Sequence, residues 1–298
     1  MQKYFDAFIN SFRGTIDWTW KSILFDVPWY TNYFWGIILL SVLVWILEIA
    51  FPWRKNQAVF RKDFWLDGFY IFFNFFLFAI AISGFYKLLE VLFLDLGISV
   101  DTLSLFNIRG WSPFLQLVVF FILLDFVQWF THMLLHRYAF LWEFHKVHHS
   151  VKEMGFAAHM RYHWMENLFY KPLKTFAVMI LGGFEPEQAY IVHFFAIAIG
   201  HLNHSNIKLT WGPLKYIFNN PVMHLYHHAY ELPEGRKNGV NYGISLSLWD
   251  YIFKTNYIPE DSGLVPLGYE GDDEMPKSFL GQLVHGFHFK SKNRAASE

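Results

Sequence analysis

The sequence contains no cysteine among its 298 residues. Disulfides, thiolate metal sites, cysteine-ligated iron–sulfur clusters and cysteine nucleophiles are therefore excluded within this chain. Any metal that the chain binds must be held by nitrogen or oxygen atoms. Histidine is the obvious nitrogen donor, because 13 of the 15 histidines fall between His132 and His228.

Charged residues are also scarce, at 16% of the chain, whereas apolar residues make up 54%. This composition is too apolar for an ordinary soluble protein. The net charge of -1 gives no indication of nucleic acid as a partner. Several apolar runs approach the roughly 20 residues that a helix needs to cross a bilayer. We therefore expect an all-α integral membrane protein.

Three apolar segments, 34–51, about 69–94 and 113–135, are long enough to be spanning helices. Basic residues cluster after the first of them, which predicts by the positive-inside rule that the following loop is cytoplasmic. Two more crossings then return the chain to the cytoplasmic side at His136. The basic cluster consists of Arg54, Lys55, Arg61 and Lys62.

Two further apolar segments, 173–182 and 190–199, are each too short to span a bilayer alone. They form either a helical hairpin that enters from the cytoplasmic side or one broken span. Only the hairpin returns His201 and His204 to the side that carries the other histidines. If the histidines share one site, the hairpin is the expected arrangement.

We expect one domain over residues 1–298, with about three spanning helices, the hairpin and a cytosolic, histidine-rich helical cap. Residues 1–30 form an interfacial segment, either a helix on the membrane surface or a helix packed on the domain. The membrane region covers 34–205 and the cap, with the last histidine motif, covers 206–290. The tail, 291–298, is expected to be disordered.

Three histidine motifs, one HxxxH and two HxxHH, dominate the sequence. Positions i, i+3 and i+4 share one face of a helix, so each motif projects its imidazoles together. Adjacent histidines point about 100° apart, and one metal cannot readily take both. Eight imidazoles exceed the needs of a zinc site, so they predict a dinuclear centre. Imidazole suits iron, zinc, copper and nickel, and a redox-active pair such as iron could activate dioxygen. The motifs are His132 and His136; His145, His148 and His149; and His224, His227 and His228.

The sequence is less clear about whether the remaining histidines bind the metal. We expect at least one of His201 and His204 in the site, and His159 and His163 are either ligands or hydrogen-bond partners of ligands. His193, His285 and His288 are expected to be incidental. Metal-bound imidazoles commonly donate their second N–H to a carboxylate or carbonyl. The acidic candidates for this role are Asp125, Glu143, Glu166 and Asp250.

Four segments, 125–137, 141–150, 221–228 and 241–253, resemble the fatty acid hydroxylase and sterol desaturase superfamily of membrane di-iron enzymes. The resemblance implies a helical membrane fold, a cytosolic active site, two iron ions and dioxygen as co-substrate. It also implies that Arg161, His163, Glu166, Asn241 and Asp250 support the metal ligands. The ligands that it implies are His132, His136, His145, His148, His149, His224, His227 and His228, with a further pair expected at His201 and His204.

The leading hypothesis is a membrane oxygenase that hydroxylates or desaturates a C–H position of a fatty acyl, sterol or related lipid. No HPGG haem-binding signature is present, so electrons are expected from a separate donor, cytochrome b5-like, ferredoxin-like or a pterin. An ether-lipid (alkylglycerol) monooxygenase is the alternative enzyme. A non-catalytic membrane protein that binds or transports metal is the alternative of another class, and a bis-histidine cytochrome is a weaker one.

Overall fold

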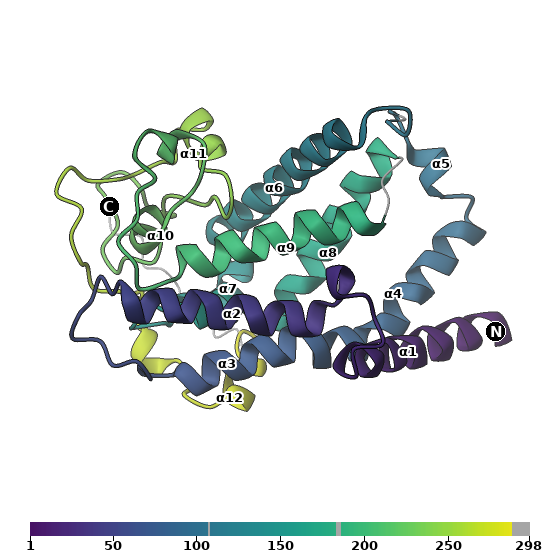
Figure 1. Ribbon diagram of the computed structural model, residues 1–298, viewed down its shortest axis with the longest axis horizontal. Coiled ribbons are helices and arrows are strands. Elements are labelled where there is room, and N and C mark those ends of the chain that lie inside the picture. Colours follow the sequence, from purple (N-terminus) through teal and green to yellow (C-terminus); the bar gives the residue numbers. More distant parts are fainter. Residues whose placement is uncertain (107, 183–185, 288–298) are drawn as a thin grey trace.

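A computed structural model describes residues 1–106, 108–182 and 186–287 (Figure 1). The expected disordered tail, 291–298, and His288 lie outside the described residues. Within the described part the regular structure is helical, with three isolated β-bridges. The helices are α1 (Gln2–Ile23), α2 (Tyr33–Ala50), α3 (Phe64–Phe72), the π-helix η2 (Phe73–Leu77), α4 (Phe78–Asp95), α5 (Val100–Leu103), α6 (Pro113–Arg137), α7 (Ala139–His149), α8 (Trp164–Leu181), α9 (Pro186–Asn203), α10 (Pro221–His227), α11 (Leu248–Ile252) and α12 (Phe279–Leu283), with short 3-10 turns between them.

Three helical segments are long and apolar enough to cross a membrane: Tyr33–Ala50, Phe64–Asp95 and Pro113–Arg137. In the most apolar 18 residues of each segment, only 17%, 17% and 28% are buried inside the protein. The remaining apolar surface is left for lipid to cover. The three expected apolar helices are confirmed as candidate spans, although the second begins five residues earlier than its apolar run. The chain is an integral membrane protein.

The second span is interrupted by η2, a π-helical segment that joins α3 to α4. The wider turn contains Asn74, whose amide donates hydrogen bonds to the carbonyls of Met160 (3.0 Å) and Tyr162 (3.1 Å). Single-turn π segments often occur at functional sites. Here the segment ties a spanning helix to the loop that follows the second histidine motif.

Helices α8 and α9 form the expected hairpin, running away from the histidine end of the molecule and back to it (Figure 1). Both pack against α6. Each has 18 residues, much longer than the apolar runs 173–182 and 190–199 that indicated them. The first half of α8, before the run 173–182, contains Glu166, Asn167 and Lys171, so hydropathy indicated only the second half of the helix.

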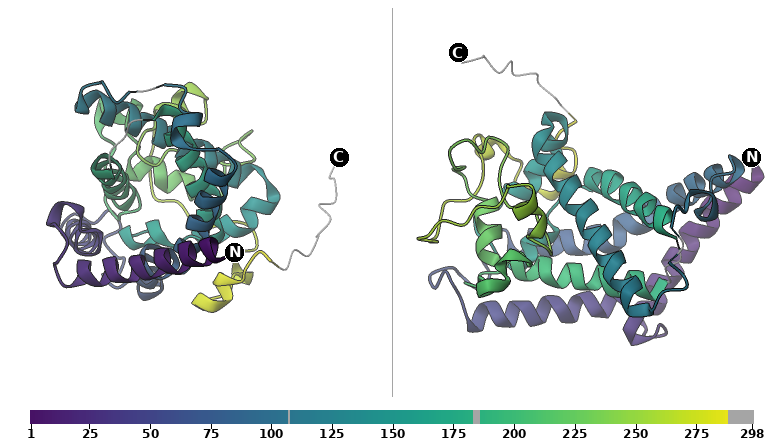
Figure 2. Two further views of the ribbon diagram at one scale, coloured as in Figure 1. Left: turned by 90° about the vertical axis from the view of Figure 1, so that its right-hand side faces the viewer. Right: turned by 90° about the horizontal axis from the view of Figure 1, so that it is seen from above.

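Helix α1 packs along α4, and hydrogen bonds join the two helices at two places. Lys3 and Tyr4 bind Asp95 at the end of α4, and Ser11 Oγ donates to the carbonyl of Ser83 (3.3 Å). Figure 2 shows the two helices side by side at one end of the molecule. Of the two alternatives for residues 1–30, packing on the domain is therefore observed. Its position at the membrane interface stays a prediction.

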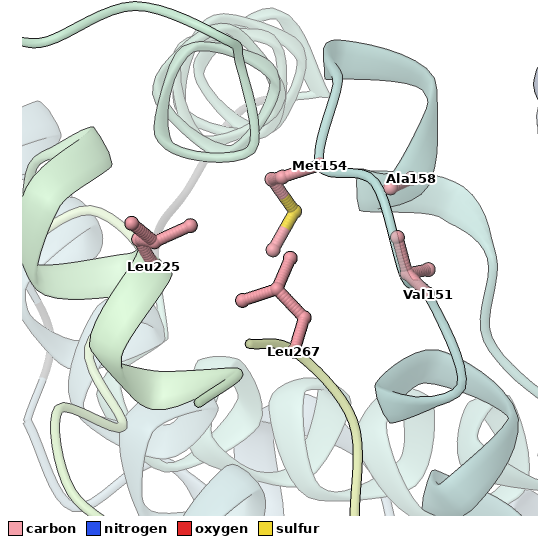
Figure 3. Close-up of a cluster of buried hydrophobic side chains, with 5 residues drawn as sticks. All are labelled: Val151, Met154, Ala158, Leu225 and Leu267. Carbon is pink, nitrogen blue, oxygen red and sulfur yellow. The ribbon is translucent and has the colours of Figure 1, made fainter. Parts of the chain in front are cut away.

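A buried apolar cluster fastens the cap to the loop that follows α7 (Figure 3). Leu225 of α10 and Leu267 of the C-terminal segment meet three residues of that loop, Val151, Met154 and Ala158. Leu225 lies between His224 and His227, so this packing also holds the third histidine motif. Removing such a buried leucine side chain typically costs about 2–5 kcal/mol.

Candidate metal centre

Nine histidines gather into two groups in which the ring nitrogens that face one another lie within 4.8 Å. Helices α6, α7 and α10 supply the first group, and α7, α10 and the residue after α9 supply the second. All are buried except His136, which is partly exposed. The first group is His132, His136, His145, His149 and His227, and the second group is His148, His204, His224 and His228.

The two groups are neighbours because α7 and α10 contribute to both. Adjacent residues separate: His148 enters the second group and His149 the first, and His228 and His227 divide in the same way. The ring centroids of His149 and His228 are only 4.3 Å apart. The two groups therefore adjoin each other, and each could hold a metal ion.

The first group is oriented by hydrogen bonds to the outer nitrogen of its rings. His132 Nδ1 lies 2.7 Å from the carbonyl of Tyr242, and His227 Nδ1 lies 2.8 Å from that of Val240. A carbonyl can only accept, so each Nδ1 carries the proton and each Nε2 is left with a free lone pair. The Nε2 atoms of His132 and His145 face each other at 3.1 Å.

The second group follows the same rule. His148 Nδ1 donates to the carbonyl of Arg161 (3.1 Å) and His204 Nδ1 donates to that of Gly200 (2.7 Å). Their Nε2 atoms are 3.2 Å apart. His224 Nε2 completes the cluster at 2.8 Å from His204 Nε2 and 3.2 Å from His228 Nε2.

Several ring nitrogens at the centre are buried without any hydrogen-bond partner. A buried polar atom with no partner is costly and needs an explanation. A metal ion supplies one, because neutral imidazole suits iron, zinc, copper and nickel. In the first group the unpartnered atoms are Nε2 of His136, His149 and His227, and a metal ion fits them. In the second group the fit rests on the Nε2 atoms of His148, His204, His224 and His228, which converge without a proton donor of another kind between them. Nδ1 of His224 and Nδ1 of His228 are also buried without a partner, on the outer side of their rings.

The protonation state also suits metal binding. Burial lowers the pKa of the histidines outside the spanning helices well below the usual 6.5, and repulsion between the neighbouring imidazoles adds to it. Neutral imidazole, the form that binds metal, is therefore the stable form at pH 7. This applies to His145, His148, His149, His204, His224, His227 and His228.

Glu166 is the one carboxylate that contacts a grouped histidine among the described residues. Its Oε2 accepts from His145 Nδ1 at 3.1 Å. Its Oε1 accepts from the backbone N–H of His163, the N-cap of α8, in a reciprocal capping box. Burial raises the pKa of Glu166 to about 8. A cation next to His145 would favour the carboxylate form again.

His163 and Arg161 contribute in different ways from each other. The His163 ring caps α8 through Met165 N–H (3.1 Å) and donates from Nε2 to the carbonyl of Leu283 (2.8 Å), so it fixes the position of Glu166. Arg161 uses its carbonyl to orient His148. Its guanidinium pairs with Asp63 and Asp67 at the start of the second span.

Asp250 and Asn241 hold the loop that orients the first group. Asp250 accepts from the backbone N–H groups of Tyr242 (2.9 Å) and Gly243 (2.8 Å). Asn241 has φ 55° and binds the carbonyl of Met223 (2.8 Å) through its side chain. The carbonyls on either side of Asn241 are those that orient His227 and His132. Both residues therefore act through the backbone.

Asp125 does not bind a histidine within the described part of the chain. It accepts from the backbone N–H groups of Ser245 (3.2 Å) and Leu246 (3.3 Å) and from Trp249 Nε1 (3.0 Å). Its depth in α6 is explained by these donors, because a buried acid needs partners. Glu48 behaves alike, accepting from the N–H groups of Phe156 and Asn206.

His201 is the one predicted ligand that lies outside both groups. Its Nδ1 is 2.8 Å from His159 Nδ1, and its Nε2 is 3.2 Å from Ser41 Oγ. The His159 ring in turn lies beside His204, with centroids 5.0 Å apart. His193 contacts Tyr33 (3.2 Å) away from the groups. The assignment of all ten histidines as ligands stays a prediction.

Sequence reasoning missed the carbonyl groups that orient the rings. Any residue offers a carbonyl, so residue type carries no signal for them. Gly239 is the one weak signal in the sequence for this loop. Its φ is 110°, and a Cβ at this position would lie 3.2 Å from His136 Nδ1. The loop can pass this close to the centre only with glycine.

Comparison with known proteins identifies the segment that carries this centre. A family model described as fatty acid hydroxylase matches residues 117–255. Those residues are similar to the fatty acid hydroxylase family. The fatty acid hydroxylase segment includes all nine grouped histidines, Glu166 and the loop around Asn241.

Curated relatives extend the fatty acid hydroxylase segment. The chain is 32% identical over 182 residues to an ornithine lipid hydroxylase of Rhizobium tropici, covering 61% of this chain and 53% of the relative. It is 26% identical to the alkylglycerol monooxygenase of Homo sapiens over 77% of this chain and 48% of that protein. A methylsterol monooxygenase of Arabidopsis thaliana is 27% identical over 53% and 55%. The chain spans about half the length of these relatives, and no solved structure matches it.

Proposed function

We propose that this protein is a membrane di-iron oxygenase that uses dioxygen to hydroxylate or desaturate a C–H position of a lipid. The observation that carries the proposal is the pair of adjacent histidine groups, in which outer nitrogens donate to carbonyls and inner nitrogens converge. The printed activities of the relatives, hydroxylase and monooxygenase on lipids, support the same reaction class.

In this proposal the first and second groups each hold one iron. Iron pairs of this kind supply the redox chemistry that activates dioxygen. Hydroxylation places one oxygen atom in the C–H bond and reduces the other to water with two electrons and two protons. Desaturation uses the same electrons and protons but removes two hydrogens from the lipid and yields two waters.

The residues of the chain have separate tasks in this reaction. The carbonyls of Tyr242, Val240, Arg161 and Gly200 hold the imidazoles in one tautomer and one orientation. Glu166 holds His145 and makes it more basic. The burial of the groups keeps bulk water away from the reacting centre.

The electrons come from a separate donor in this proposal, cytochrome b5-like, ferredoxin-like or a pterin. We place the centre on the cytoplasmic side, because the basic residues that follow α2 lie between the first and second spans at the histidine end. Three crossings plus the α8–α9 hairpin give this topology. Protease protection of tagged loops in sealed vesicles tests it.

An ether-lipid monooxygenase is the second candidate. The likeness to the human alkylglycerol monooxygenase covers 77% of this chain, more than the likeness to the ornithine lipid hydroxylase covers. The two candidates differ in the lipid that is consumed. Product analysis of alkylglycerols against acyl and sterol lipids, with tetrahydrobiopterin and protein donors compared, separates them.

The deciding experiment is elemental analysis and an optical spectrum of the detergent-purified protein, followed by lipid turnover under oxygen. About two irons per chain, no haem band and oxygen-dependent lipid oxidation are expected. Zinc alone on protein that has not exchanged its metal, or metal flux in proteoliposomes without oxygen consumption, would contradict the proposal. The latter result would favour a metal transport protein.

A further inference from the structure

Two lysines of α8 face the interior of the helical bundle, below the histidine centre. Lys171 and Lys174 are three residues apart and so share one face of the helix. Neither is well exposed. An ionisable residue at the depth of a membrane is costly, and such residues usually mark a functional site.

No carboxylate oxygen of residues 1–106, 108–182 and 186–287 lies within ion-pair distance of either ammonium. Lys174 Nζ donates to Gln128 Oε1 of α6 at 2.7 Å and lies 5.5 Å from the Tyr170 ring. Lys171 Nζ lies 5.3 Å from the Tyr86 ring and 6.0 Å from that of Phe78, both on α4. The direct contacts of both ammonium groups within the described residues are thus with neutral side chains.

The carboxylates nearest in the fold are already engaged. Asp125 accepts from Ser245, Leu246 and Trp249, and Glu166 accepts from His145 and His163. Asp125 lies close enough to Lys174 for the two charges to interact, and the two lysines and His193 of α9 also lie near one another. Neither ammonium, however, is paired directly with a carboxylate of the described residues.

The side chains beside the lysines are not sealed inside the protein. Lys171 and Lys174 are partly exposed, and His193 is exposed although its ring contacts Tyr33 of α2 and stacks on Phe75 of η2, with the ring centroids 6.0 Å apart. A lipid beside α8 can therefore reach this group of side chains.

We propose that Lys171 and Lys174 bind the anionic group, phosphate or carboxylate, of a lipid that enters the bundle beside α8. An ammonium paired with such an anion forms the charge-assisted hydrogen bonds that the described residues leave unmade. The inference rests on the proposed function, because that lipid is then the substrate. It names the substrate class: a lipid with a negatively charged group.

The helix also sets how far the anion lies from the metal centre. Glu166 contacts His145, and Lys171 and Lys174 follow it by five and eight residues, about 8 and 12 Å along the axis of α8. Side chains on a helix tilt toward its N-terminus, here toward the histidines. The oxidised carbon therefore lies near the charged end of the lipid and not far along an acyl chain.

The test is lipid binding without turnover, by native mass spectrometry of the iron-loaded protein in phosphatidylcholine nanodiscs. The discs contain phosphatidic acid or the diacylglycerol with the same chains, and oleate or oleyl alcohol. The protein is expected to retain the anionic member of each pair. In the double variant Lys171→Gln, Lys174→Gln the preference falls about tenfold or more, and Lys171→Arg with Lys174→Arg keeps it.

Lys208→Gln is the matched control, because Lys208 also lies near an aromatic ring, that of Trp53 at 5.7 Å, but outside the bundle. It should bind both lipids like the unchanged protein. The single variants Lys171→Gln and Lys174→Gln, each monodisperse with normal iron content, replace the double variant if it misfolds. A preference in the Gln variants equal to that of the unchanged protein overturns the proposal.

Inorganic phosphate is added in a separate arm. If phosphate alone displaces phosphatidic acid at the same concentration, the site binds free anions and the lipid assignment is wrong. If the unchanged protein oxidises a lipid but shows no preference for the anionic lipids, only this inference is wrong. If the unchanged protein prefers the anionic lipids but binds no iron and oxidises no lipid, the proposed function is wrong and the lysine site stands.

Discussion

The two histidine groups share α7 and the third histidine motif at α10, but different parts of the chain orient them. The first group depends on the cap, through the carbonyls of Val240 and Tyr242, and on the carboxylate of Glu166. The second group depends on carbonyls alone, those of Arg161 and of Gly200 in the last turn of α9. One metal position is therefore tied to the cap and to a charge, and the other to the end of the hairpin.

Removal of a histidine from either group should have the largest effect. His148→Ala and His228→Ala are expected to reduce iron from about two to about one per chain and to lower lipid turnover at least a hundredfold. His132→Ala should do the same from the other group. Membrane insertion should remain normal, because His148 and His228 lie outside the spanning helices and alanine at His132 keeps α6 apolar and helical.

Iron content, turnover and membrane extraction measure these outcomes on the same preparations. His285→Ala is the control, since His285 is partly exposed and its nearest carboxylate oxygen, on Glu143, is 3.9 Å away. Full activity in His148→Ala or His228→Ala would contradict the role assigned to the second group.

Glu166→Gln should separate the two groups. Glutamine can still accept the capping hydrogen bond from His163, so α8 is preserved while the charge beside His145 is lost. We expect iron affinity to fall about 10- to 100-fold at one position of two, since partners of metal-bound histidines typically contribute this much. Titration with iron under anaerobic conditions should show one weakened and one unchanged site. Two equally weakened sites would show that Glu166 does not act through the first group.

Asp250→Ala should loosen the first group through the backbone. The change leaves the N–H groups of Tyr242 and Gly243 without their acceptor, and each buried unsatisfied donor costs about 1–3 kcal/mol. Thermal unfolding of the metal-free protein should show the loss, and iron should be weakened mainly at the position that involves His132. Asp250→Asn, which keeps an acceptor, should recover part of the stability. Unchanged unfolding in Asp250→Ala would contradict the anchoring role.

His201→Gln should have the smallest effect. The His201 ring lies outside both groups, so iron content should stay near two per chain and turnover should fall only a few-fold through the contact with His159. Glutamine keeps a polar side chain near Ser41. Loss of one iron in this variant would restore His201 as a ligand, as the sequence pattern predicts.

The division of the histidines between two groups and the hairpin that contributes to the second group could both be predicted from the sequence. The spacing of His148 and His149 requires them to point apart, and the structure places them in different groups. The argument that a shared site needs a hairpin is supported by His204, whose ring reaches His148. Helical periodicity and apolar length were enough for these features, because both depend on local geometry.

Other features depend on contacts between distant segments and left no local pattern. Asp125 was expected to face a polar interior or a ligand, but it binds backbone N–H groups 120 residues away. Arg161 orients His148 with its carbonyl, a group that every residue has. The length of α8 was underestimated because its first half contains Glu166, Asn167 and Lys171.

The π-helical segment Phe73–Leu77 has a consequence for how the chain can vary in length. A π-helical turn accommodates one extra residue, so a deletion there restores a regular α-helix while α3 and α4 keep their phase. A deletion in α3 would instead rotate the rest of the span by about 100°. Phe78 and Tyr86 would then turn away from Lys171, and Gly84 would leave its close contact with Phe8. Insertions and deletions in this span are thus constrained by the phase of the helix as well as by its hydrophobicity.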